Sequence, residues 1–207
     1  MTNHEPITPS ENQNPVLDTE PWFNLSKYNQ NHFDRGKPLW FILLWWIVEG
    51  IIFPLTPHNF NGVRRTLLKL FGAKVGKQVV IRSSARFLYP WKVEIGDYSW
   101  IGDRTYFYSL DKIIIGSHAV ISQHSYLCTG SHDYNQTTFD LITSPIMIGN
   151  GVWVASDCFI APGVHIGANT VIGTRSTVLH NIPSAKIAWG TPCKVKCDRK
   201  PPHNVNG

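Results

Sequence analysis

A six-residue repeat between Val75 and Val178 constrains the fold of this chain more than any other feature. Within each block, every sixth residue is aliphatic or Phe, and Gly follows directly in seven cases. Small or branched residues come four places later. We expect Gly at each corner because it permits backbone angles that other residues resist. The repeat positions are Val75, Ile81, Phe87, Ile95, Ile101, Phe107, Ile115, Ile121, Leu127, Ile148, Val154, Ile160, Ile166, Ile172 and Val178.

This period is typical of a parallel β-helix, in which each six-residue unit contributes one short strand and one corner. A β-sandwich would instead show a period of two, with turns at irregular intervals. Three units would form one triangular coil. The sequence therefore predicts an all-β fold, a parallel β-helix of about five triangular coils, preceded by a short helical segment.

The repeat is interrupted at three places, and each interruption follows three units. Two residues are inserted after Phe87, two after Phe107 and fifteen after Leu127. All three insertions should then leave from the same edge of the prism. Coils stack about 4.8 Å apart, so the inserted segments should form one patch, and loops on a rigid scaffold commonly carry function. We expect the active site there, on segments 89–91, 108–111 and 129–145.

Composition and the remaining segments set the broader expectations. The chain has 207 residues, of which 43% are apolar and 16% charged, with a net charge of +5. These values exclude wholesale disorder and do not indicate a nucleic-acid-binding protein. The four scattered Cys and the absence of a signal-peptide pattern favour a reduced, cytoplasmic protein. We expect a mobile arm (1–21), an N-terminal segment with an apolar helix (22–74), the β-helix (75–182) and a basic tail (183–207).

The apolar stretch 39–55 reads LWFILLWWIVEGIIFPL and leaves three interpretations open. It could span a membrane, lie on a membrane surface, or pack on its own protein or a neighbouring subunit. Seventeen residues are at the lower limit for a span, and Glu49 would be costly in lipid. We therefore expect any membrane contact to be peripheral. A second, shorter helix is predicted over 63–72, ending at Gly72.

Several segments carry a family resemblance that covers roughly residues 17 to 198. The chain resembles the hexapeptide-repeat acyltransferases, and within them the O-acetyltransferases of exopolysaccharide synthesis, of the colanic-acid type. This resemblance implies a left-handed β-helix, acetyl-CoA as the acyl donor, a sugar hydroxyl as the acceptor and a homotrimer. The segments that carry it are NLSKYNQ (24–30), YPWKVEIGDYSWIG (89–102), ISQHSYLCTGSHDY (121–134), VWVAS (152–156) and WGTPCKV (189–195).

The resemblance assigns the catalytic base to His132, at the root of the long insertion. Imidazole titrates near neutral pH and can take the proton of an attacking hydroxyl. A solvent-facing loop His is the alternative. Asp133 could orient the imidazole ring or stabilise the turn. Tyr108, Ser109 and Asp111 are candidates for acceptor binding, although relatives tend to carry Asn near Ser109.

Cofactor binding is assigned by the same resemblance to the groove between two neighbouring β-helices. Relatives often have Lys where this chain has His180. The basic tail supports phosphate binding independently, since it holds five basic residues against one acidic residue, although a solvated basic tail is the alternative. The candidate positions are Trp153, Ala155, Ser156, Thr174, Leu179, His180 and Lys194.

The remaining His and Cys residues do not predict a second kind of catalytic or metal-binding site. His118 and His124 are six residues apart and should lie on different faces, so no metal site is predicted. Cys193 and Cys197 lack a second ligand pair. Cys128 could form an acyl-enzyme with His132, but its corner position favours packing. A small-molecule acetyltransferase and a non-catalytic β-helix scaffold remain alternative functions, and peripheral membrane contact through 39–55 favours an acceptor at the membrane.

Overall fold

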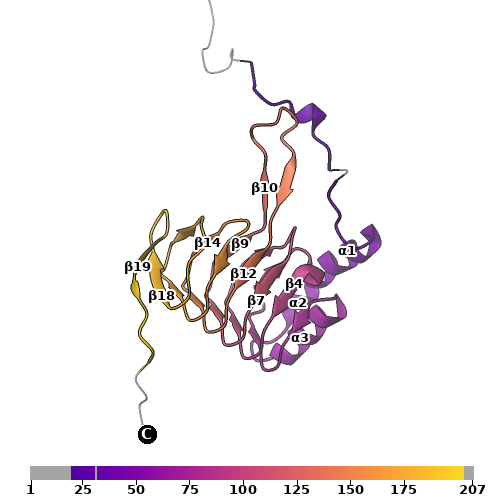
Figure 1. Ribbon diagram of the computed structural model, residues 1–207. Helices are drawn as coiled ribbons and strands as arrows, with labels where there is room; N and C mark the ends of the chain where they lie inside the picture. Colours follow the sequence, from indigo (N-terminus) through magenta and orange to yellow (C-terminus); the bar gives the residue numbers. More distant parts are fainter. Residues whose placement is uncertain (1–19, 31, 203–207) are drawn as a thin grey trace, which may run out of the picture.

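Three parallel sheets form the faces of a solenoid in the computed structural model, which describes residues 20–30 and 32–202 (Figure 1). Sheet A comprises β1 (Lys74–Val75), β4 (Val93–Ile95), β7 (Ile113–Ile115), β12 (Ile146–Ile148) and β15 (His165–Ile166). Sheet B comprises β2 (Val80–Ile81), β5 (Trp100–Ile101), β8 (Val120–Ile121), β13 (Trp153–Val154), β16 (Val171–Ile172), β18 (Lys186–Trp189) and the antiparallel β19 (Lys194–Asp198). Sheet C comprises β3 (Arg86–Phe87), β6 (Tyr106–Tyr108), β9 (Tyr126–Cys128), β14 (Phe159–Ile160) and β17 (Thr177–Val178).

The predicted parallel β-helix is confirmed, and it extends beyond the five predicted coils into a sixth through β18. Every one of the fifteen repeat positions is buried, and none is more than 7% exposed. Equivalent positions stack from coil to coil, as in the pairs Ile81–Ile101 and Ile101–Ile121 of sheet B. Each buried aliphatic side chain of this size contributes roughly 1.5–3 kcal/mol of transfer free energy. The repeat is thus the interior of the solenoid.

The reason we expected for the repeat glycines is wrong. None of the seven adopts a positive φ; that conformation falls two residues later, on residues such as Arg104 (φ 53°) and His118 (φ 55°). The glycines are required because the next coil passes very close to them. A Cβ at Gly116 would lie 2.6 Å from the backbone nitrogen of Asn150. Stacked coils therefore exclude a side chain at this position.

Helices cover the N-terminal end of the solenoid. A continuous helical stretch runs through α1 (Leu39–Ile47), the π-helical η2 (Val48–Ile52) and α2 (Phe53–Leu55), and α3 (Asn61–Leu70) follows. The predicted second helix thus begins two residues early and ends before Gly72, which has a φ of +89°. None of the helices in the described part of the chain is long and apolar enough to cross a membrane. Short 3-10 turns lie at η1 (Leu25–Lys27) and η3 (Pro90–Lys92).

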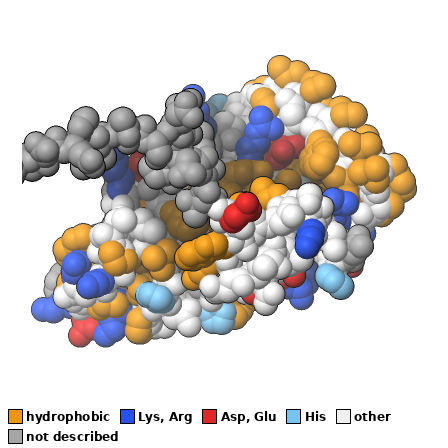
Figure 2. Space-filling model, turned by 90° about the horizontal axis from the view of Figure 1, so that it is seen from above, with side chains coloured by type: hydrophobic (Ala, Val, Ile, Leu, Met, Phe, Trp, Pro, Cys, Tyr) orange, Lys and Arg blue, Asp and Glu red, His pale blue; other side chains and the backbone are white. Residues whose placement is uncertain are grey.

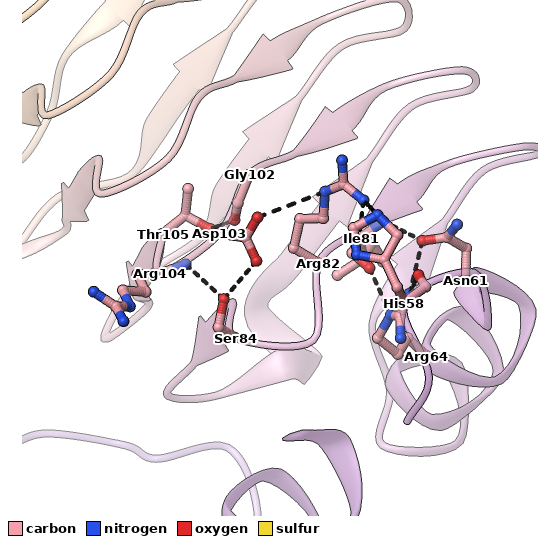
Figure 3. Close-up of polar contacts among 10 residues, drawn as sticks. All are labelled: His58, Asn61, Arg64, Ile81, Arg82, Ser84, Gly102, Asp103, Arg104 and Thr105. Atoms are coloured by element: carbon pink, nitrogen blue, oxygen red, sulfur yellow. Dashed lines mark hydrogen bonds and ion pairs between the residues drawn. The ribbon is translucent and has the colours of Figure 1, made fainter. Parts of the chain in front are cut away.

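Side chains of these helices bond to the open backbone of the first coil, which has no preceding coil to pair with. Glu49 accepts a hydrogen bond from the Phe87 N–H, and the indole of Trp45 donates to the Phe87 carbonyl, 2.7 Å away. Asn61 Oδ1 accepts from the Ile81 N–H (Figure 3). An unpaired strand edge invites aggregation, so these contacts stabilise and close the edge.

Arg64 is the centre of this closure and is fully buried. Its Nε donates to the Ile81 carbonyl at 2.5 Å, and its other nitrogens bond to oxygens of residues 56–58 and of Asn61. A buried charge is tolerated only when its hydrogen bonds are satisfied. Figure 3 shows this arginine between the loop that precedes α3 and the first coil.

The two ends of the chain differ in what the structure describes. Of the predicted mobile arm, residues 1–19 lie outside the described residues. The basic tail forms β18 and β19, which pair antiparallel and complete sheet B. Residues 203–207 also lie outside the described part.

Candidate active site

All three insertions leave the solenoid at the edge between sheets C and A, as the sequence predicts. The first links β3 to β4, the second links β6 to β7, and the third links β9 to β12. The third is a hairpin of β10 (Gly130–His132) and β11 (Leu141–Thr143), with His132 paired opposite Leu141. The hairpin projects away from the coils in Figure 1. We call this part of the molecule the C/A edge.

Buried hydroxyls tie the three insertions together. Thr129 Oγ1 donates to the Tyr108 carbonyl at 2.8 Å and accepts from the Asp111 N–H at 2.9 Å. Ser109 is fully buried, and its Oγ accepts from the Tyr89 N–H and donates to the Tyr89 carbonyl. The hydroxyl of Ser109 therefore supports the first insertion from within, and a role in acceptor binding stays a prediction.

His132 lies at the end of β10 with its ring fixed on two sides. Its Nδ1 is 2.9 Å from the carbonyl oxygen of Phe139, and the two rings stack with centroids 4.4 Å apart. A carbonyl only accepts, so Nδ1 carries the proton in this contact. In the neutral ring, Nε2 is then left with a lone pair and can accept a proton. The geometry leaves His132 equipped as a base.

Residues 23–28 of the N-terminal segment lie against the hairpin and were not foreseen at the site. Phe23 stacks on Phe139 with centroids 4.7 Å apart, and the Tyr28 ring lies 5.7 Å from the His132 ring. The backbone N–H of Asn24 donates to the Thr137 carbonyl at 2.7 Å. We call residues 23–30 and 32–34 the strap, since the first of these ranges contacts the hairpin and the second contacts the solenoid edge.

The other end of the strap is held by Lys92. Its Nζ donates to the carbonyls of Asp34 (2.9 Å) and Leu110 (2.6 Å) and lies over the ring of Phe33. Burial lowers the pKa of this ammonium, while the carboxylates of Asp111 and Asp34 act in the opposite direction. Lys92 thus joins the strap to the second insertion.

The two acidic candidates serve the backbone around them. Asp133 Oδ1 accepts from the Asn135 N–H, so it stabilises the hairpin turn, which is one of its two predicted roles. Asp111 Oδ1 accepts from the Lys112 N–H at 2.7 Å, and its Oδ2 is 3.5 Å from Thr143 Oγ1. Asp111 therefore spans the second insertion and the hairpin.

Tyrosines cover sheet C beside this edge. Tyr106 stacks on Tyr126 with centroids 5.3 Å apart, and Tyr108 contacts both. Burial is the largest cause that raises the pKa of all three phenols. They are therefore neutral at physiological pH and available as hydrogen-bonding groups, of which Tyr108 lies nearest the inserted segment.

Four of the cofactor candidates lie at the edge between sheets B and C, which we call the B/C edge. Ala155 is buried there, while Ser156 and Thr174 line a hollow of about 580 Å³. Lys194 pairs with Trp189 at the end of β18, and the next residue along the chain, Gly190, accepts from the N–H of Thr177. The hollow also contains residues that the sequence analysis did not assign to cofactor binding: Gln123, His124, Asp157 and Arg175.

Arg175 lines this hollow with 81% of its side chain accessible, and it forms an ion pair with Asp157 at 3.0 Å. Trp153 lies on the outer face of sheet B, and its indole donates to Ser122 Oγ at 3.0 Å. Leu179 and His180 follow β17 and lie at the C/A edge, two coils from the hairpin. The cofactor candidates of one chain therefore do not all lie at the same edge.

Three of the tail cations contact other residues of the last coils or of the tail. Lys186 pairs with Asp198, and Arg199 donates to the carbonyls of Gly151 and Asn169, so both support the last coils. Lys196 lies over the ring of Trp189.

The cysteines of the described chain are all free thiols. Cys128 donates to the Gly130 carbonyl at 3.1 Å, in keeping with a packing role at the root of the hairpin. Burial raises the pKa of Cys158 and of Cys193, so both stay protonated. Within residues 20–30 and 32–202, no three His, Cys, Asp or Glu side chains converge as a metal-binding group.

Comparison with known proteins identifies a family for this chain. Residues 145–180 match the family model of the bacterial transferase hexapeptide (six repeats). The putative colanic acid biosynthesis acetyltransferase WcaF of Escherichia coli K12 is 49% identical over 165 residues, which cover 80% of this chain and 91% of WcaF. The chain belongs to the hexapeptide-repeat acetyltransferases.

Solved structures of sugar acetyltransferases share the fold. A maltose O-acetyltransferase from Clostridium difficile 630 superimposes with a TM-score of 0.71 at 25% identity, covering 79% of this chain and 90% of that one. A galactoside acetyltransferase in complex with coenzyme A gives a TM-score of 0.70 at 27% identity, covering 77% and 81%. Membership of this family makes the chain an acetyltransferase.

Proposed function

We propose that this protein transfers the acetyl group of acetyl-CoA to a sugar hydroxyl of a polysaccharide or of its lipid-linked precursor. The observation that carries the proposal is His132, whose Nδ1 is engaged by the Phe139 carbonyl while Nε2 is left to accept a proton. The similarity to WcaF, named for colanic acid biosynthesis, supports a polysaccharide as the acceptor. Cytoplasmic localisation is part of the proposal, because acetyl-CoA is there.

The reaction follows from general base catalysis. Nε2 of His132 takes the proton of the sugar hydroxyl while the hydroxyl oxygen attacks the thioester carbonyl carbon. The carbon–sulfur bond then breaks, and the imidazolium returns the proton to the leaving thiolate. The Phe139 carbonyl stabilises the imidazolium through Nδ1. Transfer is direct, since the thiol of Cys128 is bonded to the Gly130 carbonyl.

Acetyl-CoA fits the groups found at the B/C edge. Trp153, on the outer face of the neighbouring sheet B, offers apolar surface for the pantetheine arm. Ala155 keeps the corner small, and Ser156 and Thr174 offer hydroxyls. Lys194 and Arg175 supply cations for the phosphates. Leu179 and His180 would extend the same site from the C/A edge.

A homotrimer would unite the two edges. The B/C edge holds Ser156 and Thr174, whereas the C/A edge of the same chain holds His132 and His180. Sheet C separates the two edges within one chain. If the B/C edge of one copy faces the C/A edge of another, the donor lies beside the base, so each active site requires two copies.

The acceptor would bind at the C/A edge, beside the hairpin and the strap. Tyr28 presents an aromatic ring beside His132, and sugar rings commonly pack on such surfaces. Asp111, Tyr108 and Asp133 lie on the same edge as candidates for hydroxyl recognition. Ser109 would act indirectly, by supporting Tyr89.

The test is acetyl transfer from radiolabelled acetyl-CoA to mildly deacetylated exopolysaccharide, with the wild type and the His132→Ala variant. We expect label that hydroxylamine releases, as an ester, and a turnover about 10²–10⁴-fold lower in His132→Ala. His118→Ala is the matched control, because His118 lies at a different corner and should keep wild-type turnover.

Three results would contradict the proposal. Hydroxylamine-resistant label would indicate N-acetylation. Transfer to small soluble sugars with none to the polysaccharide would favour a small-molecule acetyltransferase, and absence of tight acetyl-CoA binding would favour a scaffold.

A further inference from the structure

The helical stretch 39–55 presents a continuous apolar surface to solvent on one side. Its inner side is buried through Ile42, Trp45, Val48 and Phe53. Nine large apolar side chains on the other side are each at least 43% exposed. We call them the apolar ridge, and they are Leu39, Trp40, Leu43, Leu44, Trp46, Ile47, Ile51, Ile52 and Leu55.

Hydrophobic side chains gather at this side of the molecule in Figure 2, which is the side where Figure 1 places α1. A helix that is apolar all round is normally buried on all sides. Monomeric proteins rarely expose a large contiguous apolar patch unless it contacts a partner or a membrane. The ridge therefore requires an occupant.

Glu49 does not interrupt this surface, although it is the one charge within 39–55. Its side chain is only 12% exposed, because it turns inward to the Phe87 N–H and to Arg86. Burial raises the pKa of this carboxyl, and the two partners partly offset that effect. The carboxylate of Glu49, whose charge would make membrane contact costly, thus lies away from the exposed side.

Charge favours an anionic lipid surface as the occupant. Between Arg35 and Lys74, Glu49 is the only acidic residue, while exposed or half-buried cations flank the helices at Lys37, Arg65 and Lys69. Two tryptophans, at positions 40 and 46, belong to the ridge, and Trp is enriched where protein meets lipid headgroups. A helix of this kind lies in the plane of the interface without crossing it.

The ridge is adjacent to the C/A edge. Ile42 packs with Tyr89 and Leu110, which belong to the first two insertions, and the Phe41 ring contacts Trp91. We propose that the apolar ridge docks on the surface of an anionic bilayer and presents the C/A edge to a membrane-anchored acceptor. This inference rests on the proposed function only for its second part.

The experiment is sedimentation of the full chain with vesicles of phosphatidylcholine containing one quarter phosphatidylglycerol. Wild type should bind these vesicles, bind neutral vesicles less, and dissociate as salt is raised. Leu44→Glu/Ile51→Glu should lower vesicle binding at least tenfold, because two large apolar side chains leave the interface. Tyr98→Glu, an exposed aromatic at a solenoid corner, is the matched control and should bind as wild type.

Acetyl transfer to the water-soluble, mildly deacetylated exopolysaccharide separates this inference from the proposed function. We expect it unchanged in Leu44→Glu/Ile51→Glu, which also shows that the variant is folded. Loss of vesicle binding with intact transfer supports the docking. The docking is wrong if wild type binds neither kind of vesicle. It is also wrong if wild type forms an assembly that is lost in the double variant, because the ridge would then be a contact between copies. Vesicle binding without any transfer would leave the docking standing and reject the proposed function.

Discussion

The solenoid and the elements added at its C/A edge are built on opposite principles. In the solenoid each residue is fixed by its equivalent one coil away, as Ile101 is by Ile81 and Ile121. At the edge, contacts join residues far apart in sequence, such as Tyr28 with His132 and Phe23 with Phe139. Repetition supplies a rigid scaffold, and the irregular segments supply chemistry that the repeat cannot.

The helical closure of the first coil should be the most sensitive part of this comparison. Arg64→Met leaves the carbonyls at Ile81 and around Thr56 without their donor inside a buried region. We expect a loss of about 3–5 kcal/mol in the free energy of unfolding. Urea denaturation measures it. An unfolding free energy within about 1 kcal/mol of wild type would show that the closure is not needed.

The next test compares a glycine of the coils with a glycine of the helices. In Gly116→Ala the new Cβ meets the backbone of the following coil, so we expect a loss of about 1–3 kcal/mol. Gly62→Ala in α3 is the matched control, since its Cβ approaches only the far end of Arg65 at 3.8 Å. It should be neutral or stabilising by up to about 1 kcal/mol. Equal effects of the two substitutions would reject close coil packing as the reason for the repeat glycines.

The strap should affect catalysis more than stability. Tyr28→Ala removes the ring beside His132, and we expect kcat to fall roughly five- to tenfold, about 1–1.4 kcal/mol of barrier. Tyr28→Phe should recover most of it, because the contact is between rings. Steady-state kinetics with the polysaccharide acceptor measures both. A rise in KM with an unchanged kcat would show that Tyr28 serves acceptor binding alone and does not position His132.

The smallest effect is expected at Glu49. Burial raises its pKa in the folded state, so the charged form is disfavoured there. The favourable contribution is therefore present below the unfolded pKa and is lost as pH rises through the folded pKa. Between the pH at which a free Glu carboxyl ionises and neutral pH, the free energy of unfolding of wild type should fall relative to that of Glu49→Gln. A difference that grows in favour of wild type over this range would contradict the burial argument.

How far the sequence predicts the molecule follows from the same comparison. The period of six identifies the buried positions and the edge of the insertions, because every coil repeats the same constraint. The period does not give the correct reason for the repeat glycines, since the close approach between coils cannot be seen within one repeat. The strap is also invisible: nothing in NLSKYNQ indicates that Tyr28 reaches a residue more than a hundred positions away.

The candidate site divides along the same line. His132 is indicated by its place at the root of the long insertion, and the hairpin carries it as expected. Its partner Phe139 and the hollow residues Arg175 and His124 are not, because their roles depend on how a hairpin folds back and how corners stack. Sequence periodicity fixes which edge a residue joins, whereas side-chain partners require the three-dimensional structure.

The pH dependence of turnover tests the central claim, that the C/A edge carries the transfer through His132, most directly. Turnover of the wild type at saturating acetyl-CoA should rise over the range in which an imidazole loses its proton, because Nε2 must be free to accept one. In His132→Ala that inflection should vanish, while the dissociation constant for acetyl-CoA stays within a few-fold. A variant that keeps the inflection and near-normal turnover would show that another residue, with His180 the next candidate, is the base.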